Sequence, residues 1–416
     1  MNRNAVVDGF KQFLQHAIDT QSFDVAELKN FMEPIFKRAG YRICRKQKKY
    51  NNILLLHEAA VGDFVTLSPA IREVRRNYPD AHITLSIDKC AKNLAELCPY
   101  VDELITGAFL ENERKFMTTY ISCLNIAQNL LLRQYDIALA FAFSLGPNVP
   151  LLAYMSGACE RISFYGGVLE PLLTEILPPF LDKTHAVDAA LRYVEHLIKQ
   201  PIETRELEVW VDDSDIEVAK NLLPKAEKIY AIGLGGTFRK KHYSPECYAE
   251  LINMLRRAEP ELKFIVLGGS NESEEAAIVM SNVDADCIVD LTGKTTFRQT
   301  AAVLNFCNMY IGNDSVAMHL AAATATPVLS PSCFASDLHA FPNVREHWSP
   351  HGVPSVVVSP THAIDECRDS KDFWGCKAKA PHCITQITPQ NLFEAYKILL
   401  GRIAEGNTEP FVFNAE

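Results

Sequence analysis

The sequence predicts an α/β protein with two doubly wound parallel sheets, and three observations lead to this fold class. Short apolar runs alternate with amphipathic segments in two separate series, as strands and crossover helices do in parallel sheets. The 416 residues are too many for one ordinary core and suggest two domains of roughly 150 to 200 residues each. A glycine turn also follows the first strand of each series, where such sheets bind ligands.

Residues 1–50 precede the first series and are expected to form a helical extension. Their apolar residues recur at three- and four-residue spacing, as at Phe10, Phe13, Leu14 and Ile18. We expect these helices to pack against the first α/β domain or a second subunit. Their end carries seven cations, which form either a solvated linker or a contact for anionic lipid or a phosphorylated acceptor: Lys37, Arg38, Arg42, Arg45, Lys46, Lys48 and Lys49.

The first series starts with the apolar run at 52–57 (NILLLH), which is typical of a buried parallel strand. A turn at Gly62 follows, and Ser68-Pro69 is expected to open the first helix. Further strands are predicted at 82–87, 101–105 and 135–143, and a helix is predicted at 185–197.

The second series predicts another sheet. Its strands are expected at 229–234, 264–268, 287–291, 309–311 and 327–329, and its helices at 245–257, 296–305 and 316–323. We place the domain boundary between about residues 199 and 223. The chain then divides into an extension at 1–50 and α/β domains at 51–205 and 206–416, with a ligand crevice where the carboxyl ends of both sheets face each other.

Charge, apolar runs and cysteine usage narrow the class of protein. The net charge of −10 argues against general nucleic-acid binding. No apolar run approaches the roughly 20 residues of a membrane span, and no signal peptide is recognisable, so we expect a cytoplasmic protein. Twelve cysteines in such a protein predict free thiols instead of a disulfide framework, with Cys159, Cys247 and Cys307 as small buried hydrophobes.

The turn at 57–63 is the first candidate site, because it follows the first core strand. Gly62 allows the backbone to turn tightly, and Asp63 projects from the turn or from the first helical position. Asp63 is either a functional carboxylate or an N-terminal charge that the helix dipole favours.

The second candidate is the stretch 233–241 (GLGGTFRKK), where a strand ends in glycines and is followed by a hydroxyl and three cations. This combination suits a diphosphate, because backbone N–H and hydroxyl groups donate hydrogen bonds while lysine and arginine neutralise charge. The alternative is a glycine turn beside a solvated basic patch.

The third candidate is the stretch 312–323 (GNDSVAMHLAAA), where a strand runs into a helix. Asp314 or Ser315 can cap this helix, with Asp314 the stronger structural candidate, and the free N–H groups at its start could bind a phosphate. His319 is expected from its local context to be a satisfied core histidine.

The fourth candidate is a late group of cysteines, Cys367, Cys376 and Cys383, with His382 adjacent and Cys333 upstream. Three thiolates and one further ligand could hold a structural zinc or iron ion. Their spacing lacks the close cysteine pair of most structural zinc sites, so free thiols in a compact loop are the alternative.

Taken together, these segments resemble glycosyltransferase family 9, the ADP-heptose:lipopolysaccharide heptosyltransferases and their relatives. The resemblance spans roughly residues 52–400 and rests on ordered motifs. These are 53–69 with its Gly-Asp turn, 78–81 (YPDA), 185–188 (HAVD), 241–246 (KHYSPE), 290–295 (DLTGKT) and 312–327. The sequence departs from the family pattern at Tyr243, Asn313 and Val316, and its first strand begins unusually late.

The resemblance implies a GT-B fold, with two Rossmann-like domains facing a cleft, the acceptor on the N-terminal domain and the nucleotide sugar mainly on the C-terminal domain. It implies transfer with inversion and without a catalytic metal. Asp63 corresponds to the proposed general base. The donor site would comprise Gly236, Thr237, Arg239, Lys241, Asp314, Ser315 and His319.

The expected substrates are ADP-heptose and a lipopolysaccharide-type glycan, and the location is the cytoplasm, with contact at the inner membrane face as one option. Two alternatives remain. One keeps the mechanism with another nucleotide sugar or a protein acceptor, as in autotransporter heptosyltransferases. The other is a catalytically silent nucleotide-sugar binding module. The oligomeric state stays open between a monomer and a homo-oligomer.

Overall fold

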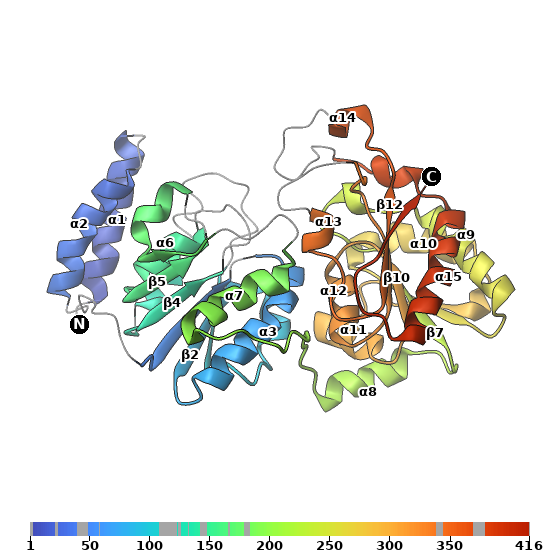
Figure 1. The fold of residues 1–416 in the computed structure, drawn as a ribbon, viewed down its shortest axis with the longest axis horizontal. Coiled ribbons are helices and arrows are strands. Elements are labelled where there is room, and N and C mark those ends of the chain that lie inside the picture. The colour runs from blue at the N-terminus through green and yellow to red at the C-terminus, as the bar shows by residue number, and fades with distance from the viewer. Residues whose placement is uncertain are drawn as a thin grey trace. The chain divides into compact units, whose positions relative to one another are not determined.

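The computed structural model describes most of the chain, and Figure 1 shows its helices and strands. The described residues are 3–20, 24–39, 49–57, 59–107, 123, 126–131, 133–141, 148–164, 167–178, 184–337, 344–368 and 379–415. The chain divides into two compact units. Unit 1 comprises Met1–Phe180 and Ala189–Glu203, and unit 2 comprises Leu181–Asp188 and Thr204–Glu416. Each unit holds one parallel sheet, so the predicted fold class is confirmed.

Unit 1 contains a six-stranded sheet in the order β3-β2-β1-β4-β5-β6. Because the chain builds outward from β1 on one side and then crosses to the other, the switch point lies between β1 and β4. The short strands β5 and β6, of which β6 is the edge strand, were not predicted. The strands are β1 (Asn52–His57), β2 (His82–Asp88), β3 (Glu103–Gly107), β4 (Ile137–Ala140), β5 (Glu160–Ser163) and β6 (Glu175–Ile176).

Helix α3 (Val61–Asn77) begins directly after the β1 turn, so the prediction that Ser68-Pro69 opens this helix is wrong. Pro69 lies inside the helix, where it cannot donate a backbone hydrogen bond. The hydroxyl of Ser68 donates to the carbonyl of Val65 at 2.7 Å, which satisfies the acceptor that proline leaves free. The Ser68-Pro69 pair, which usually marks a helix start, is therefore accommodated inside α3 by the hydrogen bond of the Ser68 hydroxyl.

The N-terminal helices α1 (Arg3–Thr20) and α2 (Val25–Arg38) belong to unit 1 and pack against its α/β core. Phe10 and Phe36 contact each other and Tyr154 of α6 (Asn148–Met155), with ring centroids 5.6 to 6.4 Å apart. The same buried cluster includes Leu54 and Leu56 of β1, so these helices extend the layer over one sheet face. In Figure 1, α3 and α7 (Ala186–Ile198) lie on the other side of the sheet from α6.

Unit 2 contains a seven-stranded sheet in the order β13-β12-β11-β10-β7-β8-β9. The switch point lies between β7 and β10. The two outermost strands beyond β11 were not predicted, although 355–358 (SVVV) reads as a buried strand. The strands are β7 (Ile229–Gly233), β8 (Lys263–Leu267), β9 (Ile288–Asp290), β10 (Met309–Gly312), β11 (Val328–Pro331), β12 (Ser355–Pro360) and β13 (Val412–Ala415).

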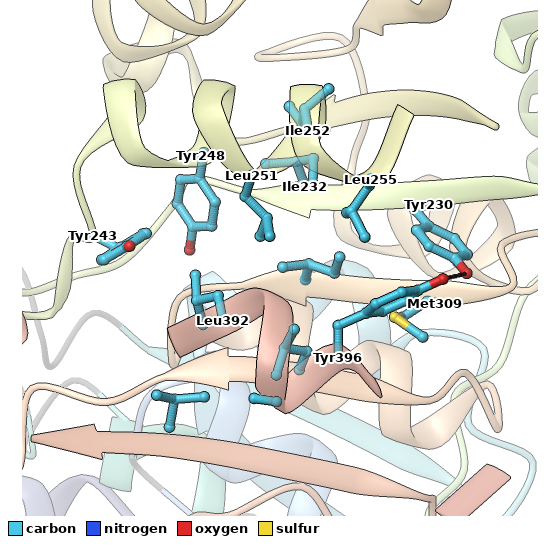
Figure 2. Close-up of a cluster of buried hydrophobic side chains, with 14 of the residues drawn as sticks. Tyr230, Ile232, Tyr243, Tyr248, Leu251, Ile252, Leu255, Met309, Leu392 and Tyr396 are labelled. Atoms are coloured by element: carbon cyan, nitrogen blue, oxygen red, sulfur yellow. Dashed lines mark hydrogen bonds between the residues drawn. The ribbon is translucent and has the colours of Figure 1, made fainter. Parts of the chain in front are cut away.

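One face of this sheet is covered by α9 (Pro245–Ala258), α10 (Ser273–Ser281) and α15 (Pro389–Glu405), whose apolar residues form a single core with alternate strand residues. Figure 2 shows part of this core, where the hydroxyls of Tyr230 and Tyr396 lie 3.2 Å apart. The helices α8 (Asp213–Leu222), α11 (Phe297–Leu304) and α12 (Val316–Ala323) pack together away from this cluster (Figure 1).

Short helices complete the described chain: α4 (Lys92–Ala95), α13 (Val344–His347) and α14 (Asp365–Arg368). Among the described helices, none combines the length and apolar character needed to cross a membrane. Nine described cysteines are free thiols, Cys247 and Cys307 among them. Cys159 and Cys307 are buried, as predicted, whereas Cys247 is only partly buried. Cys159 is disulfide-bonded, which corrects the expectation that its thiol is free.

Candidate functional site

The candidate donor residues gather at the switch point of the unit 2 sheet. Gly233 at the end of β7 and Gly312 at the end of β10 are register partners, so the two predicted loops leave the sheet side by side. Ligands of open parallel sheets bind at this position because the loops diverge there. The sequence predicted both loops separately, and the strand order brings them together.

Lys241 and Asp314 form the centre of this arrangement. The ammonium nitrogen of Lys241 donates to Oδ2 of Asp314 at 2.7 Å, although the residues lie 73 positions apart. Lys241 ends the 3-10 helix η3 (Arg239–Lys241), which follows the glycine turn. Both side chains remain about one fifth exposed, so a ligand can reach the pair. A cation held by a carboxylate at a loop junction is suited to an anionic ligand such as a diphosphate.

Asn313 connects the two loops, a role that sequence reasoning missed. Its side chain is fully buried and makes three hydrogen bonds. Its Oδ1 accepts the backbone N–H of Tyr243 at 3.0 Å and the hydroxyl of Tyr248 at 2.9 Å, and its Nδ2 donates to the carbonyl of Leu234 at 2.6 Å. The neighbouring rings of Tyr243 and Tyr248 are visible in Figure 2. The only available signal was an amide residue between a strand end and Asp314.

Tyr310 explains why glycine occupies both strand ends. Its hydroxyl donates to the carbonyl of Asn313 at 3.1 Å. A β-carbon at Gly233 would overlap the Tyr310 hydroxyl oxygen, and one at Gly312 would lie 2.5 Å from the same atom. These two glycines therefore accommodate a buried side chain.

Ser315 and His319 begin the α12 side of the site. Ser315 is the N-cap residue of α12, which leaves the carboxylate of Asp314 for Lys241 and corrects the preference for Asp314 as the cap. His319 is buried, and burial lowers its pKa to about 4. Its Nδ1 has no hydrogen-bond partner among the described residues, so the expectation of a satisfied core histidine is wrong for this atom.

Gly236, Thr237 and Arg239 lie on the β7 loop. The carbonyl oxygen of Gly236 lies 2.8 Å from Nε2 of His242, which fixes the turn. Thr237 and Arg239 are exposed, and the Arg239 guanidinium pairs with Glu275 of α10. Arg239 and Lys241 are thus each paired with a protein carboxylate, and of these two pairs only that of Lys241 and Asp314 joins the β7 loop to the β10 loop.

A third loop, after β8, carries a buried carboxylate that the sequence analysis did not single out. Glu272 is 3% exposed, and its Oε2 accepts the backbone N–H of Gly269 at 2.7 Å. The same oxygen would lie 3.6 Å from a β-carbon at Gly235 of the β7 loop. Glu272 therefore fixes the start of the β8 loop and lies next to Gly235 of the β7 loop.

Asp63 lies at the switch point of the other sheet, in unit 1. It occupies the first turn of α3 after β1, and its Oδ2 accepts the backbone N–H of Ala60 at 3.2 Å. This contact is the one expected if Asp63 serves as a negative charge at the helix N-terminus. The side chain is half-buried and accessible. His57 at the end of β1 is buried, and desolvation lowers its pKa to about 4.

The late cysteines form a separate cluster in unit 2. The sulfur of Cys367 lies 2.9 Å from Nε2 of His382, and the ligand atoms of Cys367, His382 and Cys383 all lie within 4.8 Å of one another. Cys376 and four cations of the basic stretch, Arg42, Arg45, Lys46 and Lys48, lie outside the described residues. Lys49 is described, and its ammonium group lies 3.7 Å from the carboxylate of Asp80. Cys333 belongs to the main core instead.

Comparison with known proteins gives a consistent family signal. The sequence profile described as "Glycosyltransferase family 9 (heptosyltransferase)" matches residues 123–332. The chain is 23% identical over 306 residues to lipopolysaccharide heptosyltransferase 3 of Escherichia coli K12, which covers 69% of this chain and 85% of that protein. It is 21% identical over 369 residues to the lipopolysaccharide core heptosyltransferase OpsX of Haemophilus influenzae, with 85% and 95% covered.

Solved structures show the same fold. A glycosyltransferase family 9 structure from Veillonella parvula superposes with a TM-score of 0.67 at 20% identity, covering 85% of this chain and 98% of the other. The ADP-heptose lipopolysaccharide heptosyltransferase II of E. coli superposes with a TM-score of 0.63 at 18% identity, covering 85% and 99%. These matches support the expected GT-B class of two Rossmann-like domains.

Proposed function

The chain belongs to glycosyltransferase family 9, and from this premise we propose that it transfers heptose from ADP-heptose to a hydroxyl of a lipopolysaccharide-type glycan. The donor and acceptor classes come from its relatives, which are named as lipopolysaccharide heptosyltransferases. The observation that carries the proposal is the Lys241–Asp314 pair, held by Asn313 at the switch point of the unit 2 sheet.

The proposed donor site binds the diphosphate through Lys241 and the start of α12. The ammonium group supplies positive charge, while the first N–H groups of this eight-residue helix supply donors for phosphate oxygens. The exposed Thr237 hydroxyl and the Arg239 guanidinium add donors from the β7 loop. Ser315 and His319 lie beside Asp314, and we assign them to the sugar and phosphate end of the donor.

Asp63 is our candidate for the general base on the acceptor side. In the proposed step the acceptor oxygen attacks the anomeric carbon from the face opposite ADP, and Asp63 takes the proton of the attacking hydroxyl. The new carbon–oxygen bond forms as the bond to the diphosphate breaks, so the sugar is inverted and ADP leaves. Lys241 neutralises charge that develops on the leaving diphosphate, a task that needs no metal ion in this proposal.

The first test is transfer from ADP-heptose to a lipopolysaccharide acceptor that lacks heptose, followed as ADP release and as acceptor mass. We expect transfer with ADP-heptose and much less with UDP- or GDP-sugars. Transfer to a protein hydroxyl alone would replace the glycan acceptor in the proposal, and donor binding without any transfer would favour a silent binding module.

The expected cytoplasmic location with inner-membrane contact remains part of this proposal.

The second test is Asp63→Asn, which keeps the side-chain shape but removes the basic oxygen. Turnover should fall by roughly 100-fold or more, the usual scale for losing acid–base assistance, while donor affinity stays unchanged. Asp80→Asn is the matched control, because Asp80 is an exposed carboxylate of the same unit. Near-normal turnover in Asp63→Asn would exclude Asp63 as the base and leave the transfer activity itself standing.

A further inference from the structure

The Cys367–His382–Cys383 cluster gathers three metal-binding side chains where no step of the proposed transfer uses them. Cys367 and Cys383 are 1% and 0% exposed, and His382 approaches the Cys367 sulfur through Nε2 at 2.9 Å. All three ligand atoms lie within 4.8 Å of one another. Three convergent ligands of this kind are common around a metal ion and rare in an apolar core.

We propose that these three side chains hold a structural metal ion of the thiophilic class, zinc or iron. Thiolate and imidazole together select such ions over magnesium or calcium, which prefer oxygen ligands. Buried cysteines usually act as small hydrophobes. Here the polar nitrogen of His382 is brought against one sulfur with the second sulfur close by, which gives the cluster a polar centre.

The position of the cluster explains what the ion would do. Cys367 lies on the four-residue helix α14, and Cys383 begins the four-residue 3-10 helix η6 (Cys383–Gln386). Their buried neighbours, Ala335 and Ala363, form a small cluster apart from the main core of unit 2. Such short elements bury little apolar surface and gain little stability from packing. A metal ion that links Cys367 to His382, 15 positions apart, would stabilise this part of unit 2.

The proton balance of metal binding follows from the hydrogen bonds of His382. Its Nδ1 accepts the backbone N–H of Cys383 at 2.5 Å, which places the ring proton on Nε2, facing Cys367. Metal binding displaces the proton on Nε2 of His382 and the protons of the two thiols. The imidazole keeps its own proton by moving it to Nδ1, where the contact with the Cys383 amide is lost. The two thiol protons are therefore the ones released to solvent.

Metal content of the purified full-length chain is the first test. We expect about one equivalent of zinc or iron per chain by elemental analysis. Removing it with a chelator should lower the melting temperature, and adding Zn²⁺ back should restore it. Transfer activity measured well below the melting temperature should change little, because the ion is structural. A metal-free preparation whose melting temperature does not respond to Zn²⁺ would overturn the proposal.

Co²⁺ loading of the metal-depleted chain identifies the ligands without a mutation. Thiolate coordination should produce a sulfur-to-cobalt charge-transfer band in the near ultraviolet, together with visible bands of tetrahedral cobalt. Absence of the charge-transfer band would exclude Cys367 and Cys383 as ligands.

Substitutions then assign the site. Cys367→Ser, His382→Gln and Cys383→Ser should each lower the metal content and the melting temperature. Cys307→Ser is the matched control, since Cys307 is a buried cysteine of the same unit whose thiol bonds to the carbonyl of Val303. If Cys307→Ser and all three site variants contain equal amounts of metal, the assignment is refuted. Where a site variant folds poorly, the Co²⁺ spectrum of the parent chain still tests the thiolate ligands, because that measurement needs no variant.

Discussion

Lys241→Ala removes the cation of the proposed diphosphate site. A charge-assisted hydrogen bond contributes about 1.5–3 kcal/mol, so losing one contact to phosphate should weaken ADP binding about 10- to 150-fold. Adenosine lacks phosphate and should lose little affinity. Isothermal titration calorimetry with ADP, ADP-heptose and adenosine measures all three.

Asp314→Asn is a more demanding test, because its expected effect on ADP affinity is opposite to that of Lys241→Ala. Asp314 holds Lys241 at 2.7 Å and also places a negative charge beside the proposed diphosphate. At about 5 Å and an effective dielectric constant of about 20, two like charges repel by roughly 3 kcal/mol. Removing this carboxylate should leave ADP affinity unchanged or raise it, while the advantage of ADP-heptose over ADP shrinks if Asp314 binds the sugar.

Lys240→Ala is the control for general loss of positive charge. Lys240 lies on the same 3-10 helix, with its ammonium group over the Phe238 ring at 5.9 Å. Its removal should weaken ADP binding by less than a few-fold. Equal losses for ADP and adenosine in Lys241→Ala would show that the lysine acts through the fold. A loss of ADP affinity in Asp314→Asn as large as in Lys241→Ala would refute the assigned charges.

Two further predictions concern stability. Asn313→Ala should cost at least about 3 kcal/mol in urea unfolding, because it strands the Tyr243 N–H, the Tyr248 hydroxyl and the Leu234 carbonyl at about 1–3 kcal/mol each. A cost no larger than that of Asn282→Ala, at an exposed helix end, would contradict it. The pKa of His319 is lowered to about 4 by burial, so the unfolded chain takes up its proton first, near pH 6.5. The stability that neutral His319 contributes is therefore complete above pH 6.5 and falls by up to roughly 3 kcal/mol as the pH drops toward 4. His319→Gln should reduce the slope by the share of one histidine, because His57 and His347 also have pKa values lowered to about 4 by burial. An unchanged slope would exclude His319 as a contributor.

The alternation of apolar runs predicted both sheets, because buried parallel strands are continuous in sequence. The run at 52–57 and the strand at 309–311 were placed within a residue or two of β1 and β10. The strands β5, β6 and β13 were not predicted because they are two to four residues long and lie toward sheet edges. Strand β12 has six residues and a buried apolar run, so its omission was an error of interpretation. Pro69 misled the helix prediction because the Ser68 hydroxyl takes over a bond that sequence rules assign to the backbone.

The candidate site was predicted in its parts but not in its connections. Lys241 and Asp314 were each visible as charged residues after a strand, but their contact depends on the β7–β10 pairing, which no local pattern encodes. Asn313 looked like a departure from the family pattern. Its importance comes from three bonds to residues up to 79 positions away. Long-range hydrogen bonds of this kind leave no periodic signal in the sequence.

The packing of Tyr310 between Gly233 and Gly312 also constrains how this protein can evolve. A side chain at Gly233 would meet the hydroxyl oxygen of Tyr310 and its ring carbons, the nearest at 2.5 Å, so Tyr310→Phe alone would not make room. The aromatic ring must therefore be lost before Gly233 can acquire a side chain. At Gly312 a β-carbon would also lie 2.7 Å from the backbone Cα of Gly233, so this position stays closed even after the ring is lost. Substitution at Gly233 thus has a required order, and a lineage that keeps the ring keeps both glycines.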